Sequence, residues 1–412
     1  MTNNPSTAQS WKNLYHSTQS LTQADSGHLM FTEQDILDLD EMVKRIFIKF
    51  LAEGELHKGI KVYVDRELQN GMVEEMADRP PLPEESIEDW CKVIFGERKF
   101  GVIFNSLESY SNELAEKMST IVAPLLQEAG IPLGGLSFLF FMGNYGFTPF
   151  GVHKEAKGEE GFLFHLGPAN KHFYTWDNEE LNTIEHNAKV FHEVDEMLPD
   201  AQCYQLKPKS VMFIPNHLYH IGNTEKFSLS VVMDYINPSL AFLEKTIAKE
   251  IAEQEVTIAS DHQYVSPVAY KNKQINWNDL LDLPSWESKY RRAMERRIQR
   301  LRSNGGILKA ALKDSRKILP PQDFVMEGKT IFTLLEYIDQ NNQTYIFARG
   351  HEIPVKSNSN LSHVLSLLNE GKKLSLDELN DQLSPEWDLI DIFSTMDQLY
   401  KIDAIQTSDH SK

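Results

Sequence analysis

The spacing of hydrophobic residues divides the chain into a helical part, a β-rich part and a second helical part. Over 31–54 and 109–130, apolar residues recur three and four positions apart, which predicts two amphipathic helices, the first capped by Thr32. Between about 134 and 237 the apolar segments are short, aromatic or β-branched, and several alternate with a period of two. This pattern is typical of an all-β sandwich or barrel. Helical spacing returns over 240–255 and from Trp286.

These changes of pattern predict an α+β protein, with a boundary at the ILPPQDF segment before a small C-terminal unit. That unit contains a strand or hairpin over 344–355 and three short amphipathic helices, and Ser375 resembles the entry to a helix-turn-helix. The predicted parts are a flexible, polar N-terminus (1–30), a helical part that packs on the barrel (31–133), the barrel (134–239), a helical linker (240–317) and the C-terminal unit (318–412).

Composition restricts the class of protein. The 412 residues are 41% hydrophobic and 25% charged, as in ordinary globular proteins, and no segment approaches the ~18 apolar residues of a membrane helix. The N-terminus lacks the basic and apolar regions of a secretory signal, and two cysteines exclude a disulfide framework. We therefore expect a cytoplasmic protein. A net charge of −19 makes nucleic-acid binding unlikely and suits a basic partner.

One segment opposes this acidic average. SKYRRAMERRIQRLR, at 288–302, carries seven basic residues against Glu295 alone. It is interpreted either as the solvated face of an amphipathic helix or as a docking strip for an acidic peptide or a partner subunit.

Two histidines and a carboxylate form a candidate metal site. His153 and Glu155 are two residues apart, so on one β-strand both side chains would face the barrel interior and Lys154 would face outward. His220 follows a proline turn and precedes another predicted strand. Two histidines and one carboxylate on one face of an ion suit non-haem Fe(II), because positions remain open for a cosubstrate and O₂. The alternative for the short HxE pattern is a surface strand with an unrelated histidine.

The surrounding residues resemble a known family. Over about 134–237 the chain resembles the JmjC-type cupin family of Fe(II)- and 2-oxoglutarate-dependent oxygenases. Two segments carry this resemblance, FTPFGVHKEAKGEEGFLFHLGPANKHFYTW and LKPKSVMFIPNHLYHIGNTEKFSLSVVMDY. The resemblance implies a double-stranded β-helix, or jelly roll, with flanking helices. It also implies that His153, Glu155 and His220 bind iron, that Lys171 pairs with the distal carboxylate of 2-oxoglutarate, and that Thr148 supports that carboxylate.

The sequence departs from the family pattern in three places. Two extra residues separate the Thr-Pro turn from its histidine, the lysine comes slightly late, and Glu155 stands where Asp is commoner. His217 competes with His220 as the third ligand, but the spacing from the proline favours His220. His165 is interpreted as a hydrogen-bonded core histidine, or as a residue that touches substrate if its strand face is the interior.

The resemblance implies hydroxylation of a side chain within a peptide or protein, and demethylation would begin in the same way. The C-terminal unit is similar to the winged helix of ribosomal oxygenases and to winged helices that recognise precursor peptides, and 240–315 is similar to the dimerisation region of related oxygenases. We therefore expect a homodimer that acts on a ribosomal protein or on a ribosomally made precursor peptide. The alternative function is that of a cupin-like binding or scaffold protein without turnover.

Overall fold

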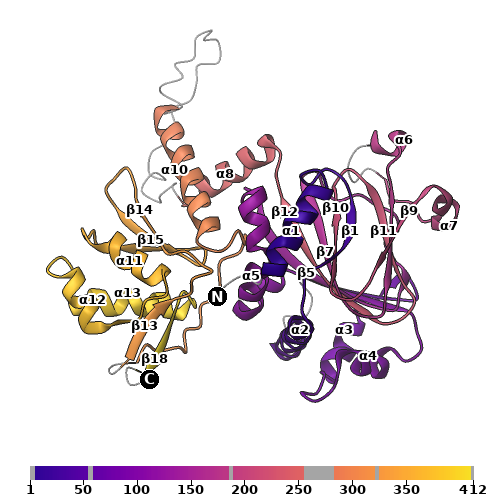
Figure 1. Cartoon of the computed structure of the whole chain (residues 1–412), viewed down its shortest axis with the longest axis horizontal. Coiled ribbons are helices and arrows are strands. Elements are labelled where there is room, and N and C mark those ends of the chain that lie inside the picture. The colour runs from indigo at the N-terminus through magenta and orange to yellow at the C-terminus, as the bar shows by residue number, and fades with distance from the viewer. Residues whose placement is uncertain (1–4, 54–58, 185–188, 255–282, 321–323, 410–412) are drawn as a thin grey trace, which may run out of the picture.

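The structure is a computed structural model that describes residues 5–53, 59–184, 189–254, 283–320 and 324–409. A β-rich part and a C-terminal unit lie side by side, and the two helices that connect them lie along the top of the view (Figure 1). All paired strands in the named sheets are antiparallel, and helices accompany both parts. The α+β class is therefore confirmed. Within the described ranges, no helix is long and apolar enough to cross a membrane.

Two sheets enclose the central pocket of the β-rich part. The larger has the order β1-β10-β7-β12-β5-β4-β2-β3 and the smaller the order β6-β11-β8-β9. The larger sheet consists of β1 (Asp25–Leu29), β10 (Ser210–Ile214), β7 (Glu159–Pro168), β12 (Ser228–Ile236), β5 (Gly135–Gly143), β4 (Phe100–Asn105), β2 (Ile60–Val64) and β3 (Glu67–Leu68). The smaller consists of β6 (Gly146–Phe147), β11 (Tyr219–Thr224), β8 (Lys171–Trp176) and β9 (Gln202–Leu206).

Alternation along β5 separates the main core from the pocket. Phe138, Phe140 and Met142 are fully buried in the main core on the outer face, whereas Leu139 and Phe141 line the pocket on the inner face. The helices that contribute to this core are α1 (Pro5–Ser17), α2 (Glu33–Glu53), α3 (Met72–Asp78), α4 (Ile87–Phe95) and α5 (Asn112–Ala129). The main core thus holds the larger sheet rigid behind the pocket.

The prediction of a flexible N-terminus is wrong for the described residues from 5 onward. Helix α1 packs on α5, Trp11 and Leu14 are fully buried, and Trp11 Nε1 donates to Ile121 O at 2.6 Å. Strand β1 then pairs with β10 at the edge of the larger sheet. A few large apolar side chains suffice to bury this segment, although its average composition is polar.

The part predicted as helical, 31–133, also contributes strands β2, β3 and β4 to the larger sheet. The residues IKVYV of β2 alternate between buried and less buried positions, as expected for a strand with one face on the core. The barrel therefore uses chain on the N-terminal side of the predicted boundary at 134.

The outer face of the smaller sheet is covered by the segment 177–201, except for residues 185–188, which lie outside the described ranges. We call its described residues the cover segment. It contains α6 (Glu179–Asn182), α7 (Val194–Met197) and the 3₁₀ helix η2 (Leu198–Asp200). Val152, Trp176, Tyr219 and Ile221 form a second, smaller core beneath it.

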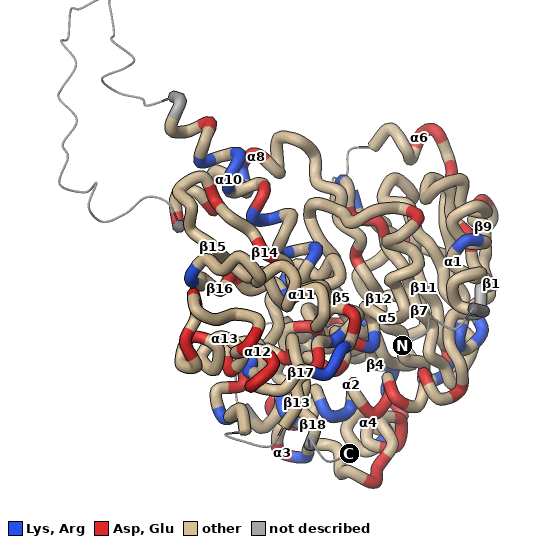
Figure 2. Tube along the Cα trace, turned by 60° about the vertical axis from the view of Figure 1, so that its left-hand side comes forward, with Lys and Arg blue, Asp and Glu red and all other residues tan. Residues whose placement is uncertain are grey.

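Helices α8 (Leu240–Gln254) and α10 (Leu283–Arg302) connect the β-rich part to the C-terminal unit. Arg297 and Arg300 each reach the Glu250 carboxylate at 2.5 Å, and Arg300 also reaches Glu352 at 2.5 Å. Arg296 pairs with Glu352 as well. Blue residues along α10 accordingly lie beside red ones on neighbouring elements (Figure 2). For these three arginines both predicted roles are wrong, because they are partly buried in internal ion pairs.

The C-terminal unit has its own core. Its elements are β13 (Phe324–Gly328), β14 (Leu335–Ile338), β15 (Thr344–Ala348), β16 (His351–Val355), α11 (Leu361–Asn369), β17 (Leu374–Ser375), α12 (Leu376–Leu383), α13 (Leu389–Lys401) and β18 (Ile405–Asp409). Ser375 caps α12 in a reciprocal capping box with Glu378, as the sequence indicated for this helix entry. Asn112 on α5 donates to Asp403 at 2.8 Å and ties the unit to the β-rich part. Its winged-helix character stays a prediction.

Candidate metal centre

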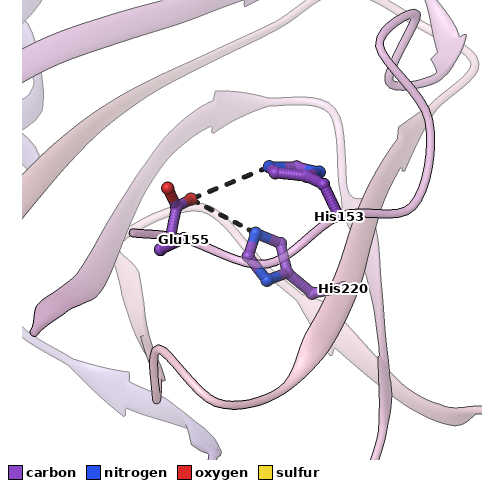
Figure 3. Close-up of side chains that lie close together, drawn as sticks. All are labelled: His153, Glu155 and His220. Carbon is purple, nitrogen blue, oxygen red and sulfur yellow. Dashed lines mark ion pairs between the residues drawn. The ribbon is translucent and has the colours of Figure 1, made fainter. Parts of the chain in front are cut away.

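Three side chains from two distant segments converge at one wall of the pocket (Figure 3). Oε1 of Glu155 lies 3.3 Å from Nε2 of His220 and 3.8 Å from Nε2 of His153. One possible ligand atom from each residue lies within 4.8 Å of those of the other two. The structure thus brings together the predicted triad.

The first two residues of this triad do not lie on a regular strand, contrary to the prediction. The backbone makes only isolated bridges here, between His153 and His220 and between Val152 and Phe191. His153 N donates to His220 O at 3.2 Å, and His220 N donates to His153 O at 2.9 Å. This bridge places two of the three side chains directly beside each other.

The prediction for Lys154 is half wrong. The side chain points away from the triad, toward the cover segment, but it is only 3% exposed. A charged group next to solvent was expected, and a buried ammonium surrounded by carbonyl oxygens is found.

Hydrogen bonds fix which nitrogen of each imidazole faces the triad. Nδ1 of His153 lies 3.0 Å from Gly151 O, and Nδ1 of His220 lies 3.2 Å from Leu218 O. A carbonyl oxygen only accepts, so each neutral ring carries its proton on Nδ1. Both Nε2 lone pairs are then free to bind a metal, and the carbonyls hold the rings in orientation.

The charges at the triad also suit a divalent cation. Burial alone would raise the pKa of Glu155, but the adjacent His153 and His220 imidazoles hold it well below its usual range. Burial, together with the charge of His153, lowers the pKa of His220. At neutral pH the site therefore offers an anionic carboxylate and a neutral His220 imidazole, which are the ligand forms that a metal requires.

Lys171 lies at the base of the same pocket, which has a volume of about 400 Å³. Its side chain is 1% exposed, and Nζ has one hydroxyl neighbour, Ser230 Oγ at 3.4 Å. Nζ also lies 5.2 Å from the centre of the Phe141 ring. Burial lowers the pKa of Lys171 to about 7. A Cβ at Gly222 would lie 3.2 Å from Lys171 Cε, so glycine leaves room for this side chain.

Two further hydroxyl groups lie near this base. Thr148 Oγ1 donates to Gly222 O at 3.0 Å and accepts from Gly222 N at 3.2 Å, and the residue lines the pocket. The buried Tyr145 hydroxyl has no hydrogen-bond partner among the described residues. The Tyr145 ring stacks on Phe141, and its centre lies 5.5 Å from Lys171 Nζ. Tyr145 was not predicted, because its only signal in the sequence is a position three residues before Thr148.

Of the competing histidines, His217 is exposed, whereas His220 is buried and lines the pocket. His165 is fully buried, with Nδ1 3.2 Å from Ser230 Oγ and Nε2 2.7 Å from Ala169 O. Burial, with a contribution from Lys171, lowers the pKa of His165 to about 4. The interpretation of His165 as a hydrogen-bonded core histidine is therefore confirmed.

Asp234, on β12, lines the pocket and was not predicted. Within the described residues its carboxylate has no hydrogen-bond partner. Burial, with the nearby carboxylates of Glu155, Glu159 and Glu108, raises the pKa of Asp234 to about 8. The pocket thus presents an acid near the triad and a cation at its base.

The residues present fit a metal ion and an anionic small molecule. Two imidazoles and a carboxylate are a suitable ligand set for a first-row divalent metal. Among the described residues, the buried Lys171 ammonium has one hydroxyl partner and the nearby Tyr145 hydroxyl has none, and such a pair is suited to bind a carboxylate.

Comparison with known proteins supports the predicted fold. No protein-family model matches the sequence, and no curated protein matches it significantly. Among solved structures, the ribosomal oxygenase YcfD of Escherichia coli is similar, with a TM-score of 0.52, 12% identity and coverage of 96% of this chain and 98% of that chain. A structure of YcfD in complex with cobalt and succinic acid gives a TM-score of 0.52 at 12% identity, covering 97% and 98% of the two chains. The chain therefore has the cupin-like fold of this ribosomal oxygenase.

Proposed function

We propose that the chain is an Fe(II)- and 2-oxoglutarate-dependent oxygenase that hydroxylates a side chain within a peptide or protein. The observation that carries this proposal is one pocket with the His153, Glu155 and His220 triad on its wall and Lys171 at its base, where the described residues give Nζ only the Ser230 hydroxyl as a hydrogen-bond partner. The similar fold of YcfD, whose structure contains cobalt and succinic acid, supports it.

Nε2 of His153, Nε2 of His220 and the Glu155 carboxylate would hold the iron. Such a triad leaves coordination positions for other ligands. When bound, iron and 2-oxoglutarate supply the oxidising power to hydroxylate an unactivated C–H bond. Phe150 packs edge-on against His153 with ring centres 4.6 Å apart, and Phe173 stacks on His220 at 5.5 Å. These rings keep water from the back of the imidazoles.

Lys171 and Tyr145 would donate to the distal carboxylate of 2-oxoglutarate, whereas Thr148, whose one hydroxyl hydrogen goes to Gly222 O, would line the site beside them. An ammonium in apolar surroundings attracts a carboxylate strongly, since little water competes for either group. The Tyr145 hydroxyl would then gain a partner. Leu139, Leu163 and Val232 line the pocket and contribute to its apolar wall.

Asp234 favours a basic target residue. It lies in the pocket that contains the triad, and a cationic side chain would favour its ionised form, which burial and three other carboxylates disfavour. The net charge of −19 favours a basic protein in the same way. Between the two predicted substrate classes, these charges favour a ribosomal protein over an acidic precursor peptide.

The connecting helices supply a surface for a homodimer. On α8, Leu240 is 69% and Phe242 62% exposed, and Trp286 on α10 is 40% exposed. Large apolar side chains left exposed on these helices favour a protein interface there. We further propose that the C-terminal unit is a winged helix that contributes to substrate binding, and that the protein acts in the cytoplasm, where its two free cysteines stay reduced.

Succinate formation tests the proposed function. Wild-type protein with Fe(II), 2-oxoglutarate and O₂ should form succinate slowly without substrate, and His153→Ala and Lys171→Ala should abolish this turnover. His172→Ala is the matched control, because His172 neighbours Lys171 on β8 but points to the other face of the sheet. Loss of turnover in His172→Ala as well would indicate general damage.

The alternative, a cupin-like scaffold without turnover, makes a different prediction. Such a protein would purify without stoichiometric iron, and Lys171→Ala would leave its partner binding unchanged. Absence of both iron and succinate in the wild type would favour the scaffold and contradict the oxygenase.

A further inference from the structure

Lys154 separates two of the proposed metal ligands in sequence, and its side chain enters the cover segment. Nζ donates to Leu181 O at 3.0 Å and to Asn182 O and Ile184 O at 3.3 Å. Leu181 and Asn182 end the short helix α6, and Ile184 follows it; Leu181 O also accepts from Ile184 N at 3.1 Å. The three donors of the ammonium are thus matched by three acceptors.

The same ammonium also contacts the segment of the third ligand. Nζ lies 4.8 Å from the centre of the Tyr219 ring, and Tyr219 directly precedes His220. Tyr219 is fully buried, packs edge-on against Phe191 at 5.2 Å, and donates its hydroxyl to Lys189 O at 3.4 Å. Lys154 therefore joins three parts of the chain: residues 152–155, which we call the HxE segment, the strand β11 that carries His220, and the cover segment.

The backbone alone holds the HxE segment weakly. Its paired residues make only the two isolated bridges, one from Val152 to Phe191 and one from His153 to His220. Glu155 lies beyond both bridges. Side chains alternate in direction along an extended segment, so anchoring Lys154 on one face directs His153 and Glu155 to the other.

We propose that Lys154 is a positioning residue, which orients His153 and Glu155 toward the metal by fastening their segment to the cover segment. This inference rests on the proposed function, because it presumes that the triad binds a metal. It does not require turnover, and metal binding can therefore test it separately.

The test is Co(II) binding to the full chain, measured by the visible absorption of the bound ion. Lys154→Met keeps the apolar stem and removes the donors, Lys154→Gln keeps two donors, and Lys154→Arg keeps the charge. Lys44→Met is the matched control. Lys44 is 4% exposed and donates to Pro83 O at 2.7 Å and Glu85 O at 3.3 Å, but it lies on α2, outside the pocket.

We expect Lys154→Met to weaken Co(II) binding about ten- to hundredfold, the range found when groups that orient metal ligands are removed, and to alter the absorption spectrum. Lys154→Gln should lie between it and the wild type, Lys154→Arg should restore most of the affinity, and Lys44→Met should bind Co(II) normally at a similarly lowered melting temperature. If Lys154→Met does not fold, the Gln and Arg variants carry the comparison.

Two results would overturn the proposal. Wild-type affinity and spectrum in Lys154→Met, or in the Gln variant in its place, would show that the tether does not orient the ligands. A wild-type protein that binds no Co(II) would overturn the metal site itself, and the role of Lys154 with it. Normal Co(II) binding without succinate formation would instead contradict only the oxygenase activity.

Discussion

The buried polar groups on the two faces of the smaller sheet differ in how fully they are hydrogen-bonded. On the outer face Lys154 has three carbonyl acceptors, Trp176 Nε1 donates to Met197 O at 2.9 Å, and the Tyr219 hydroxyl has an acceptor. Toward the pocket, Lys171 has one hydroxyl at 3.4 Å, and the Tyr145 hydroxyl has no partner among the described residues.

The difference separates structural from binding roles. Buried polar groups in proteins nearly always have hydrogen-bond partners, because an unpaired one costs about 1–3 kcal/mol, and more when charged. The three groups named on the outer face follow this rule, whereas Lys171 and Tyr145 satisfy it only in part or not at all among the described residues. Groups held without partners inside a pocket are prepared for a ligand, at the expense of stability.

The largest effect that separates the two faces is expected for Lys171→Met. It should weaken 2-oxoglutarate binding by about 3 kcal/mol, roughly a hundredfold, because the distal carboxylate loses its counterion. It should also raise the melting temperature of the metal-free protein, since a bare buried charge disappears. Calorimetric titration and thermal unfolding measure the two effects. A melting temperature that falls as far as that of Lys154→Met would remove the distinction between the faces.

The pH dependence of cosubstrate binding sharpens the comparison. Because the pKa of Lys171 is lowered to about 7, binding above that pH must take up a proton, and affinity should fall about tenfold per pH unit. The unfolded chain keeps this proton up to about pH 10.4, so the group adds stability as pH rises between about 7 and 10.4. Titrations in buffers of different ionisation enthalpy detect the uptake. In Lys171→Met, both dependences should disappear.

A smaller effect concerns Asp234, which lines the pocket and whose carboxylate has no hydrogen-bond partner among the described residues. We expect Asp234→Asn to reduce the stimulation of succinate formation by an arginine-rich peptide by roughly 1 kcal/mol in apparent affinity, about fivefold. The same peptide with glutamine in place of arginine should stimulate succinate formation equally in the wild type and in Asp234→Asn. If the apparent affinity falls equally for both peptides, Asp234 affects the shape of the pocket and does not recognise the charge of the target residue.

The smallest effect is expected for Gly222→Ala. The new Cβ would lie 3.2 Å from Lys171 Cε and 3.4 Å from Thr148 Oγ1, and such overpacking costs about 1 kcal/mol. We expect 2-oxoglutarate affinity to fall roughly threefold as Lys171 shifts. Gly161→Ala is the control, because its nearest contact would be an ordinary 3.6 Å. Unchanged affinity in Gly222→Ala would show that Lys171 tolerates displacement.

The sequence predicted those site residues that belong to short motifs with a characteristic spacing. An HxE triplet, a proline-led histidine and a lysine before an aromatic strand identified four side chains that the structure brings to one pocket. Tyr145 and Asp234 were missed, because what distinguishes them is the absence of hydrogen-bond partners, which only the folded chain defines. Their residue types are common, with 14 tyrosines and 60 acidic residues in the chain.

The errors have a similar origin. The N-terminal residues look polar on average, but the burial of Trp11 depends on a distant partner, the carbonyl of Ile121 on α5. The basic strip looks like a free surface, but Arg297 and Arg300 find Glu250 on the preceding connecting helix. Contacts between residues far apart in sequence override local composition in both cases.

Strand β1 has a consequence for how molecules of this protein associate. It pairs with β10, all five residues of which are buried, at the edge of the larger sheet. Without β1, an apolar strand with unpaired backbone groups would become that edge, and such edges recruit strands from neighbouring molecules. Strand β1 therefore protects the edge of β10 from such pairing, and proteolytic loss of β1 would make the protein prone to form intermolecular β-structure.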